Sequence, residues 1–490
     1  MGVALQNTAY SVNIKERLDF SCAVFNGDGS LVANAPHMPV HLGSMDRAVE
    51  TVIRENKGKI RPGDAYAINA PYNGGTHLPD ITVCTPVFDR SKILFWVASR
   101  GHHADIGGIS PGSMSPNATT IEQEGIYIDN FKLIDRGRFR EKELYALLTG
   151  GKYPARNPLQ NVNDIKAQIA ANEMGVRELH KMVRAFTLPV VRAYMRHVQD
   201  NAAESVRRVI DRLHDSTFSV ATDQGNKITV RIAVDKDRRE ATVDFTGTSP
   251  QQPSNFNAPE PVTRAAVLYV FRVMVDDDIP MNGGCLRPIR IVIPKRSLLS
   301  PEFPAAVVAG NVETSQEVTN CLFGALDAMA AAQGTMNNLN FGNARYQYYE
   351  TICSGSPAGP GFPGTDAVHT HMTNTRLTDP EVLEFRYPVL LEDFHIRKNS
   401  GGHGRWKAGD GIRRTIRFLE RMECTILSGH RRVPPFGLAG GGDGQIGENW
   451  VRRKNGHMER LRGSDATVID AGEAIIIQAP TAGGYGRPVS

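Results

Sequence analysis

The sequence lacks the signals of several common protein classes. No apolar run approaches the length of a membrane span, so we expect no transmembrane helix. The opening stretch "MGVALQNTAYS" has no basic head followed by an apolar segment, so we expect no secretory signal. No Walker loop, no dinucleotide fingerprint after a strand and no G-x-S-x-G elbow occur. The sequence therefore gives no sign of nucleotide binding or of serine-hydrolase chemistry on this chain.

Cysteine is scarce and the net charge is low. The six cysteines are far apart and form no C-x-x-C pair, which argues against a zinc ribbon and a disulfide framework. Most lie in apolar stretches such as "FSCAVF" and "ITVCTPV", so we expect core thiols in a reducing, cytoplasmic environment. The net charge is +4, and the basic residues are spread along the chain without a pattern typical of RNA or DNA binding.

The composition is that of a large globular protein. Hydrophobic residues make up 41% and charged residues 22%, and 490 residues exceed one typical core. Strand-like and helix-like stretches are mixed, so we predict an α+β fold with several subdomains. We expect a β-rich region at 1–150, a helical hairpin at 151–220, a mixed α/β region at 221–353 and a Gly-rich, β-containing region at 354–490.

Hydrophobic periodicity predicts the main elements. Apolar runs at 64–70, 81–88 and 93–99 indicate strands. Apolar residues recur at steps of three and four up to Phe186, which predicts a long helix that is capped by Asn163 or Asp164 and ended or kinked by Pro189. Further helices are expected at 46–56, 190–213, 262–275 and 315–332, and a β-hairpin is expected at 227–245.

Three side chains of metal-binding type adjoin the predicted strands of the first region. His77 and Asp80 are three residues apart in a turn with glycine and proline before the strand at 81–88. His102 follows the strand at 93–99 and comes beside Asp80 if the two strands pair antiparallel. Two imidazoles and a carboxylate suit a divalent ion such as Zn, Mn or Fe. The alternative is a turn whose histidines only form hydrogen bonds, because H-x-x-D alone is a weak signal.

Other polar residues nearby are candidates for the same site. Asp19 lies at the head of a predicted strand and is the best candidate for a fourth protein ligand, because an unpaired buried carboxylate is costly. His103 and Asp105 are candidate catalytic residues that orient the ligands or move protons. For His37 and His41 we favour loop packing over a place in the same cleft.

A second histidine pair, His369 and His371, lies in "DAVHTHMTNTR". On an extended segment both rings would point to the same face. No carboxylate partner is obvious in the sequence, so we favour a role in the substrate cleft or at an interface over a second metal site.

Long stretches of the sequence resemble the B subunits of the hydantoinase/oxoprolinase family. The most specific are "TAYSVNIKERLDFSCAVFNGDGSLVANAPHMPVHLGSM", "NAPYNGGTHLPDITVCTPVF" and "SRGHHADIGGISPGSM". Later stretches agree, among them "DFTGTSPQ", "HTHMTNTRLTDPEVLEFRYPV", "NSGGHGRWKAGDGIRR" and "PPFGLAGGGDG". The resemblance extends over nearly the whole chain.

The resemblance implies a site and a reaction. In the family a metal is held by an H-x-x-D pair and a later histidine, which match His77, Asp80 and His102, and the aspartate of "ERLDFS", here Asp19, belongs to the active centre. The implied reaction is hydrolysis of a C–N bond in a cyclic amide, namely a lactam, a hydantoin or 5-oxoproline. An A-type ATPase subunit with an actin-like fold would use ATP to phosphorylate the substrate carbonyl, and this B-type chain would complete the reaction within a hetero-oligomer.

Two other functions are alternatives to the hydrolase, and the sequence departs from the family pattern at one place. The chain could instead be the large subunit of an ATP-dependent acetone- or acetophenone-type carboxylase, or a scaffold that binds no metal. Relatives usually have a helix before "TAYS", and Met1 falls inside it here, so we expect either that the natural start lies upstream or that this chain lacks the segment.

Proton transfer by His103 or Asp105 as the ring nitrogen leaves would accelerate the reaction by about 10²–10⁴-fold. We therefore expect His103→Ala and Asp105→Ala each to lower ring-opening activity by more than about tenfold in a steady-state assay. A smaller loss in both variants would remove both residues from the mechanism.

Overall fold

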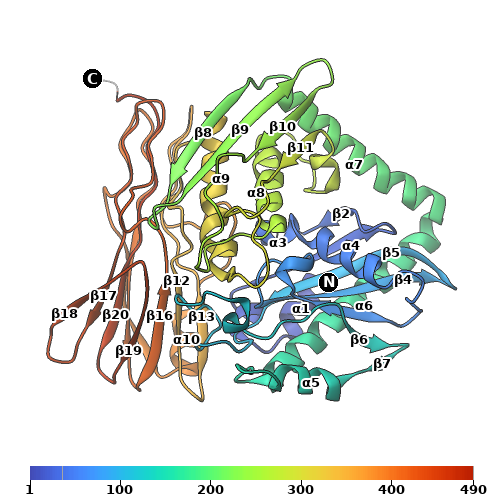
Figure 1. The fold of residues 1–490 in the computed structure, drawn as a ribbon, viewed down its shortest axis with the longest axis horizontal. Helices are drawn as coiled ribbons and strands as arrows, with labels where there is room; N and C mark the ends of the chain where they lie inside the picture. The colour runs from blue at the N-terminus through green and yellow to red at the C-terminus, as the bar shows by residue number, and fades with distance from the viewer. Residues whose placement is uncertain (36, 489–490) are drawn as a thin grey trace.

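The computed structural model confirms an α+β fold and describes residues 1–35 and 37–488. The described residues form four sheets with helices packed between and beside them. In Figure 1 the N-terminal sheet (blue) lies at the lower right, a second sheet (green) at the top, and the C-terminal strands (orange to red) at the left.

The first sheet has seven strands in the order β2-β1-β5-β4-β3-β6-β7, and each neighbouring pair is antiparallel. The strands are β1 (Phe20–Asn26), β2 (Leu31–Asn34), β3 (Ala65–Ile68), β4 (Asp80–Asp89), β5 (Lys92–His102), β6 (Phe131–Asp135) and β7 (Arg138–Phe139). β4 and β5 form a long hairpin whose open end pairs Asp80 with His102. This hairpin places the residues of the candidate site at one edge of the central strands.

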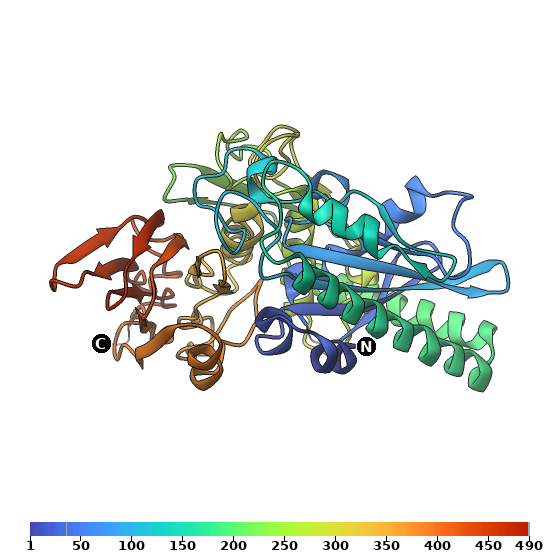
Figure 2. The same cartoon turned by 90° about the horizontal axis from the view of Figure 1, so that it is seen from below.

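Helices cover both faces of the first sheet. α4 (Met45–Glu55) packs on one face against Cys84 and Trp96, whereas α6 (Pro158–Phe186) packs on the other face against Val83. Figure 2 shows α6 running beneath the sheet. Successive side chains of a strand point to opposite faces, so a strand buried on both faces is apolar at nearly every position. The stretches "ITVCTPV" and "ILFWVA" have this pattern.

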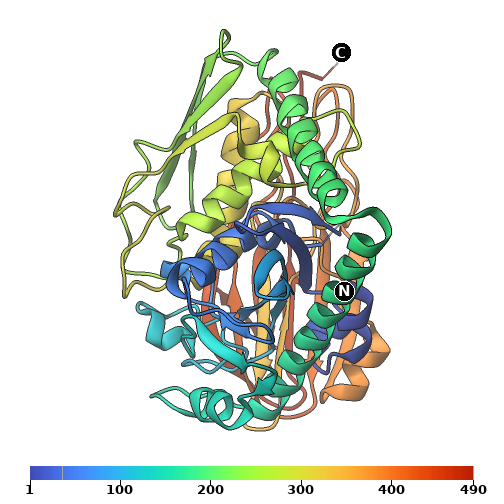
Figure 3. The same cartoon turned by 90° about the vertical axis from the view of Figure 1, so that its right-hand side faces the viewer.

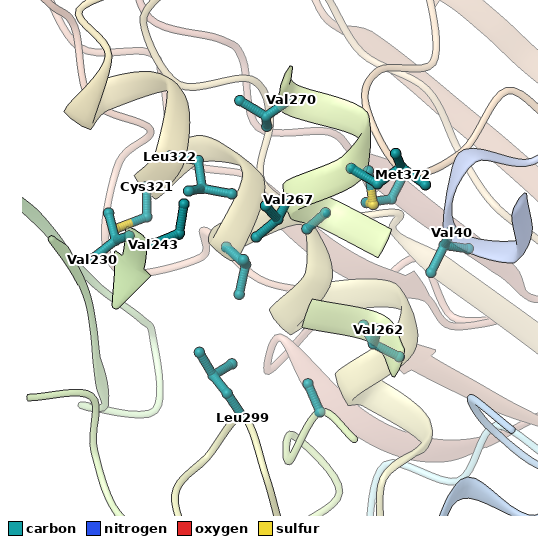
Figure 4. Packing of buried hydrophobic residues seen from close by; sticks show 14 of the residues in the cluster. Val40, Val230, Val243, Val262, Val267, Val270, Leu299, Cys321, Leu322 and Met372 are labelled. Atoms are coloured by element: carbon teal, nitrogen blue, oxygen red, sulfur yellow. The ribbon is translucent and has the colours of Figure 1, made fainter. Parts of the chain in front are cut away.

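A second core lies between a four-stranded sheet and three helices. The sheet has the order β11-β10-β9-β8, and β10 and β11 pair in parallel. Its strands are β8 (Ser216–Ala221), β9 (Lys227–Asp235), β10 (Glu240–Asp244) and β11 (Ile289–Val292), and its helices are α7 (Leu188–Ile210), α8 (Glu260–Val273) and α9 (Ser315–Ala325). In Figure 4, Val267 and Leu322 from the helices meet Val243 from the sheet. α7 follows α6 after a bend at Thr187 and packs against this second core, as Figure 3 shows from the side.

The C-terminal part of the chain is a sandwich of two sheets. One sheet has the order β13-β12-β16-β19 and the other β14-β15-β20-β17-β18. Their strands are β12 (Asn338–Gly342), β13 (Gln347–Glu350), β14 (Val389–Ile396), β15 (Ile412–Phe418), β16 (Met422–Leu427), β17 (Glu448–Arg452), β18 (Met458–Leu461), β19 (Ser464–Ile469) and β20 (Ala474–Gln478). Inward-facing residues such as Phe341, Ile416, Ile426 and Ile477 form one core between the two sheets.

Shorter helices complete the fold. They are α1 (Gly2–Thr8), α2 (Val12–Lys15), α3 (Pro39–Leu42), α5 (Glu141–Thr149) and α10 (Pro380–Arg386), together with a π-helical turn at Gly310–Thr314 directly before α9. No helix in the described ranges is both long and apolar enough to cross a bilayer. All six cysteines are free and buried, as their apolar sequence contexts predict.

Several boundaries differ from the sequence prediction. α6 begins at Pro158, where the Asn157 side chain accepts a hydrogen bond from the backbone N–H of Gln160, so Asn163 and Asp164 are not caps. Pro189 lies in the first turn of α7, where it needs no hydrogen bond partner for its nitrogen. The expected hairpin at 227–245 is confirmed as β9 and β10, but the prediction missed β8 and β11, and α9 is shorter than the expected helix at 315–332.

Helix α3 approaches α8 so closely that it requires glycine at position 43. A Cβ atom at Gly43 would lie 2.5 Å from Cα and 2.7 Å from Cβ of Ala265, although the φ angle of −76° suits any residue. We expect Gly43→Ala to lower the free energy of unfolding by about 1–3 kcal/mol through overpacking, measured by urea denaturation. The control is Gly442→Ala, where the nearest atom is 3.4 Å away. Equal urea midpoints for the two variants would contradict this prediction.

Candidate metal centre

Three central strands bring distant parts of the sequence to one edge of the first sheet. Because β1, β5 and β4 are consecutive antiparallel neighbours, the start of β1, the end of β5 and the start of β4 meet there. Asp80 lies opposite His102 in the strand register, and the backbone N–H of His102 donates a hydrogen bond to the carbonyl oxygen of Asp19 at 3.0 Å. The expected antiparallel pairing is thus confirmed, and it gathers Asp19, His77, Asp80 and His102 in one region.

The carboxylate of Asp80 lies at the centre of this region. Its Oδ1 is 3.1 Å from Nε2 of His41, and its Oδ2 is 3.2 Å from Nε2 of His77. The Thr76 hydroxyl donates to Oδ2 at 2.9 Å. Burial alone would raise the pKa of Asp80, but His41 and His77 hold the pKa well below its usual range. Asp80 is therefore an ionised carboxylate in the interior of the protein.

The two histidines between β2 and α4, His37 and His41, have different roles. His41, in α3, contacts Asp80, so the expectation that it serves only loop packing was wrong. It was missed because the chain between β2 and α4 gives no sequence signal for the direction in which α3 points. His37 accepts a hydrogen bond from the backbone N–H of Cys22 at 3.0 Å and packs against Phe20, which agrees with loop packing.

His102 is held at one ring nitrogen and on one face of its ring. Its Nδ1 is 3.2 Å from the side-chain nitrogen of Asn13, and its ring stacks on Tyr349 with centroids 4.5 Å apart. Its Nε2 has no hydrogen-bond partner among the described residues. Burial lowers the pKa of His102 well below its usual range, so the ring is neutral, which is the form that binds metal ions.

Asp19 lies beside this group but faces a cation. Its Oδ2 is 3.6 Å from Nη1 of Arg17, a fully buried guanidinium that also donates to the carbonyl oxygen of Tyr349. Burial raises the pKa of Asp19, and the charge of Arg17 opposes that rise. Asp19 thus has the charge of Arg17 beside its carboxyl group.

These residues fit a divalent ion by chemistry but are not arranged around one as they stand. Within the described ranges, no three or more His, Cys, Asp or Glu side chains already converge on one point in the way that a bound metal requires. The donor types do suit zinc, manganese or iron, and Nε2 of His102 is buried without a partner. The distances of 3.1 and 3.2 Å from the two Asp80 oxygens to two imidazole nitrogens are also close to the spacing of two ligand atoms on one tetrahedral zinc ion, about 3.3 Å for bonds of about 2.0–2.1 Å.

The two candidate catalytic residues are both held by structural contacts. His103 is buried, with Nε2 3.3 Å from Oε1 of Gln168 and Nδ1 3.1 Å from the side-chain nitrogen of Asn161. Asp105 forms an ion pair with Arg156 at 2.9 Å and accepts hydrogen bonds from backbone N–H groups of the glycine-containing loop that follows it. These contacts favour a role for Asp105 in shaping the loop. The roles of both residues in proton transfer stay predictions.

The H-x-H segment packs against the second core. Nδ1 of His371 is 3.4 Å from the Tyr269 hydroxyl, and burial lowers the pKa of this histidine to about 3. The carbonyl oxygen of Thr370, between the two histidines, accepts a hydrogen bond from Gln316 in α9. His369 has no hydrogen-bond partner among the described residues. A role of this segment in a substrate cleft stays a prediction.

The sequence prediction missed the π-helical turn at Gly310–Thr314. The side-chain nitrogen of Asn311 lies 3.3 Å from Nε2 of His77 and 3.5 Å from Oδ2 of Asp80. Two residues later, the Glu313 carboxyl accepts hydrogen bonds from the backbone N–H of Met336 and the side chain of Asn338. The stretch "GNVETSQEVTN" gave little signal, because its polar side chains would normally indicate an exposed segment.

Comparison with known proteins identifies relatives along the whole chain. The sequence model of the family described as hydantoinase B/oxoprolinase matches residues 1–488. The protein 5-oxoprolinase 1 of Arabidopsis thaliana is 47% identical over 513 residues, which cover 100% of this chain and 40% of the plant protein. This chain therefore spans 40% of the length of that relative.

Two solved structures share the fold. The ATP-dependent caprolactamase from Pseudomonas jessenii has a TM-score of 0.88 at 24% identity, covering 99% of this chain and 89% of that chain. A nucleotide-free acetone carboxylase has a TM-score of 0.87 at 15% identity, covering 99% of this chain and 73% of that chain. At these identities the likeness establishes the fold alone.

The buried carboxyl of Glu313 makes stability depend on pH. Burial raises its pKa to about 8, against about 4.3 for an exposed glutamate. The folded state thus holds this proton more tightly than the unfolded state, so the stability that it contributes is present below about pH 4 and is lost as pH rises through about 8. Because Glu313→Gln keeps a neutral side chain, we expect this variant to lose less stability than the wild type between pH 5 and about 9 in urea denaturation.

The control for this prediction is Glu178→Gln, at an exposed position of α6. We expect this variant to follow the pH dependence of the wild type. Parallel pH profiles for the wild type and Glu313→Gln would show that the Glu313 carboxyl does not hold its proton in this range.

Proposed function

Because the chain belongs to the hydantoinase B/oxoprolinase family, we propose that it is the ring-opening, metal-dependent part of an ATP-coupled hydrolase of cyclic amides. The observation that carries the proposal is the buried Asp80 carboxylate with His41, His77 and His102 around it. The names of the relatives support the substrate class, because 5-oxoproline and caprolactam are both cyclic amides. The substrate would be 5-oxoproline, a lactam or a hydantoin.

The proposal requires a partner that uses ATP. This sequence has no Walker loop or dinucleotide fingerprint, and the plant relative has more than half of its length outside the match. We propose that an A-type ATPase unit phosphorylates the substrate and that the two units work in one hetero-oligomer. The ATP dependence named for the caprolactamase supports this division of labour.

Each ring opening consumes one ATP and two water molecules. The partner transfers the γ-phosphoryl group to the carbonyl oxygen of the ring amide, which releases ADP and makes the ring carbon more electrophilic. Water adds to that carbon, and the C–N bond breaks as the ring nitrogen takes up a proton. A second water then cleaves the resulting acyl phosphate into a carboxylate and inorganic phosphate.

His77, Asp80 and His102 would hold a divalent ion, with Asp19 beside them. When bound, the ion supplies Lewis acidity at the reacting carbon–oxygen group. Asp80 contributes a carboxylate that its neighbours keep ionised, and His102 contributes a neutral imidazole. Arg17 contributes a fixed positive charge next to Asp19.

A carboxylase is the second candidate, because acetone carboxylase has a TM-score of 0.87 to this chain. In that reaction the centre would join an activated ketone, or its enol form, to carboxyphosphate or CO₂. The products separate the two candidates: a ring-opened amino acid in one case and a bicarbonate-dependent keto acid in the other.

We expect the chain, co-produced with an A-type ATPase unit, to contain a divalent ion by elemental analysis. It should couple ATP turnover to the opening of 5-oxoproline, hydantoin or caprolactam. His77→Ala and His102→Ala should lose the ion and lower activity by about 10²-fold or more, because each removes a ligand.

The matched control is His395→Ala, because His395 is an exposed histidine paired with Asp393 on β14. It should keep both metal and activity. Full activity without metal in His77→Ala and His102→Ala would favour a scaffold, and keto acid formation from acetone with bicarbonate would favour the carboxylase.

A further inference from the structure

The π-helical turn and α9 form a polar helix in the interior of the protein. All residues from Gly310 to Ala325 are buried. Half of them carry polar or charged side chains, namely Asn311, Glu313, Thr314, Ser315, Gln316, Glu317, Thr319 and Asn320. Because buried polar groups are costly unless they are bonded, a helix of this composition needs a reason beyond packing.

The π-helical turn is fixed in place by backbone contacts. A Cβ atom at Gly310 would lie 2.0 Å from the carbonyl oxygen of Asn257, so this position requires glycine. The Thr314 hydroxyl donates to the carbonyl oxygen of Phe256 at 2.5 Å. Just before the turn, the Glu124 carboxyl accepts hydrogen bonds from the backbone N–H groups of Val307 and Val308 at 2.9 and 2.8 Å. A side chain carried by this turn therefore has little freedom to move.

Asn311 is the residue that this turn presents to the Asp80 cluster. Its side-chain nitrogen is 3.5 Å from Oδ2 of Asp80 and 3.3 Å from Nε2 of His77. The orientation of the amide follows from chemistry, because an ionised carboxylate only accepts hydrogen bonds and so must face the NH₂ group. Oδ1 of Asn311 has no partner in the described part of the chain. Turns of π-helix are frequent at functional sites.

We infer that Asn311 is a positioning residue of the proposed metal centre, which holds the Asp80 carboxylate in the orientation that binding requires. The inference rests on the proposed function. Ligand carboxylates in metal sites are in turn hydrogen-bonded, and loss of such an outer partner typically costs 10–100-fold in metal affinity. The buried polar helix is then the element that carries this partner from the second core to the first sheet.

The test is metal affinity of the full chain, measured by competition with a chelator for Zn²⁺ and for Mn²⁺. We expect Asn311→Ala to weaken binding by about 10–100-fold relative to the wild type. The matched control is Asn320→Ala on the same helix, whose side-chain oxygen accepts the backbone N–H of Ala332 at 3.0 Å. This control should lose thermal stability to a similar extent but keep its metal affinity within about threefold, because Asn320 makes no contact with Asp80.

The outcomes separate this inference from the proposed function. Wild-type affinity in Asn311→Ala, together with loss of binding in Asp80→Ala, would overturn the role of Asn311 and leave the metal centre standing. Equally weak binding by the wild type and Asp80→Ala would overturn both. If Asn311→Ala does not fold, Asn311→Ser provides the same comparison, because its shorter side chain cannot span the distance to Asp80 with the same hydrogen bond.

Discussion

The interior charge of Asp80 is the constraint on which the candidate site depends. A carboxylate removed from water is costly unless its surroundings supply hydrogen-bond donors or opposite charge. His41, His77, Thr76 and Asn311 reach its two oxygens from a short helix, a turn and a π-helical turn. A single buried group thus explains why polar side chains from several unrelated elements converge at this edge of the sheet.

The rest of the fold holds these elements at the right distance. The antiparallel order of β1, β5 and β4 aligns three strand ends, and α4 and α6 bury both faces of those strands. The close approach of Gly43 to α8 fixes the helix that carries His41. The C-terminal sandwich contributes Tyr349, whose ring stacks on His102. Packing that is far from any reacting group therefore determines the geometry at Asp80.

Local sequence patterns predicted those parts of the structure that are determined by residues close together in the chain. Strands buried on both faces appeared as apolar runs, and the hairpin of β4 and β5 placed His102 opposite Asp80 as expected. The contacts of His41 and Asn311 could not be predicted in this way, because each depends on where a helix from elsewhere docks. Asn311 was also hidden by its setting, since a polar helix is normally expected at the surface. The resemblance to a family supported the metal interpretation of ligand candidates for which the spacing alone left an alternative open.

The parts of the Asp80 cluster are far apart in the chain, since His77 and Asn311 are 234 positions apart. Such contacts carry the entropic cost of closing long loops, which slows their formation. A nascent or partly folded molecule with an intact first sheet would still lack the Asn311 and Tyr349 contacts. Completion of this cluster therefore coincides with the docking of all three cores, so a partly folded molecule would have no finished centre at Asp80.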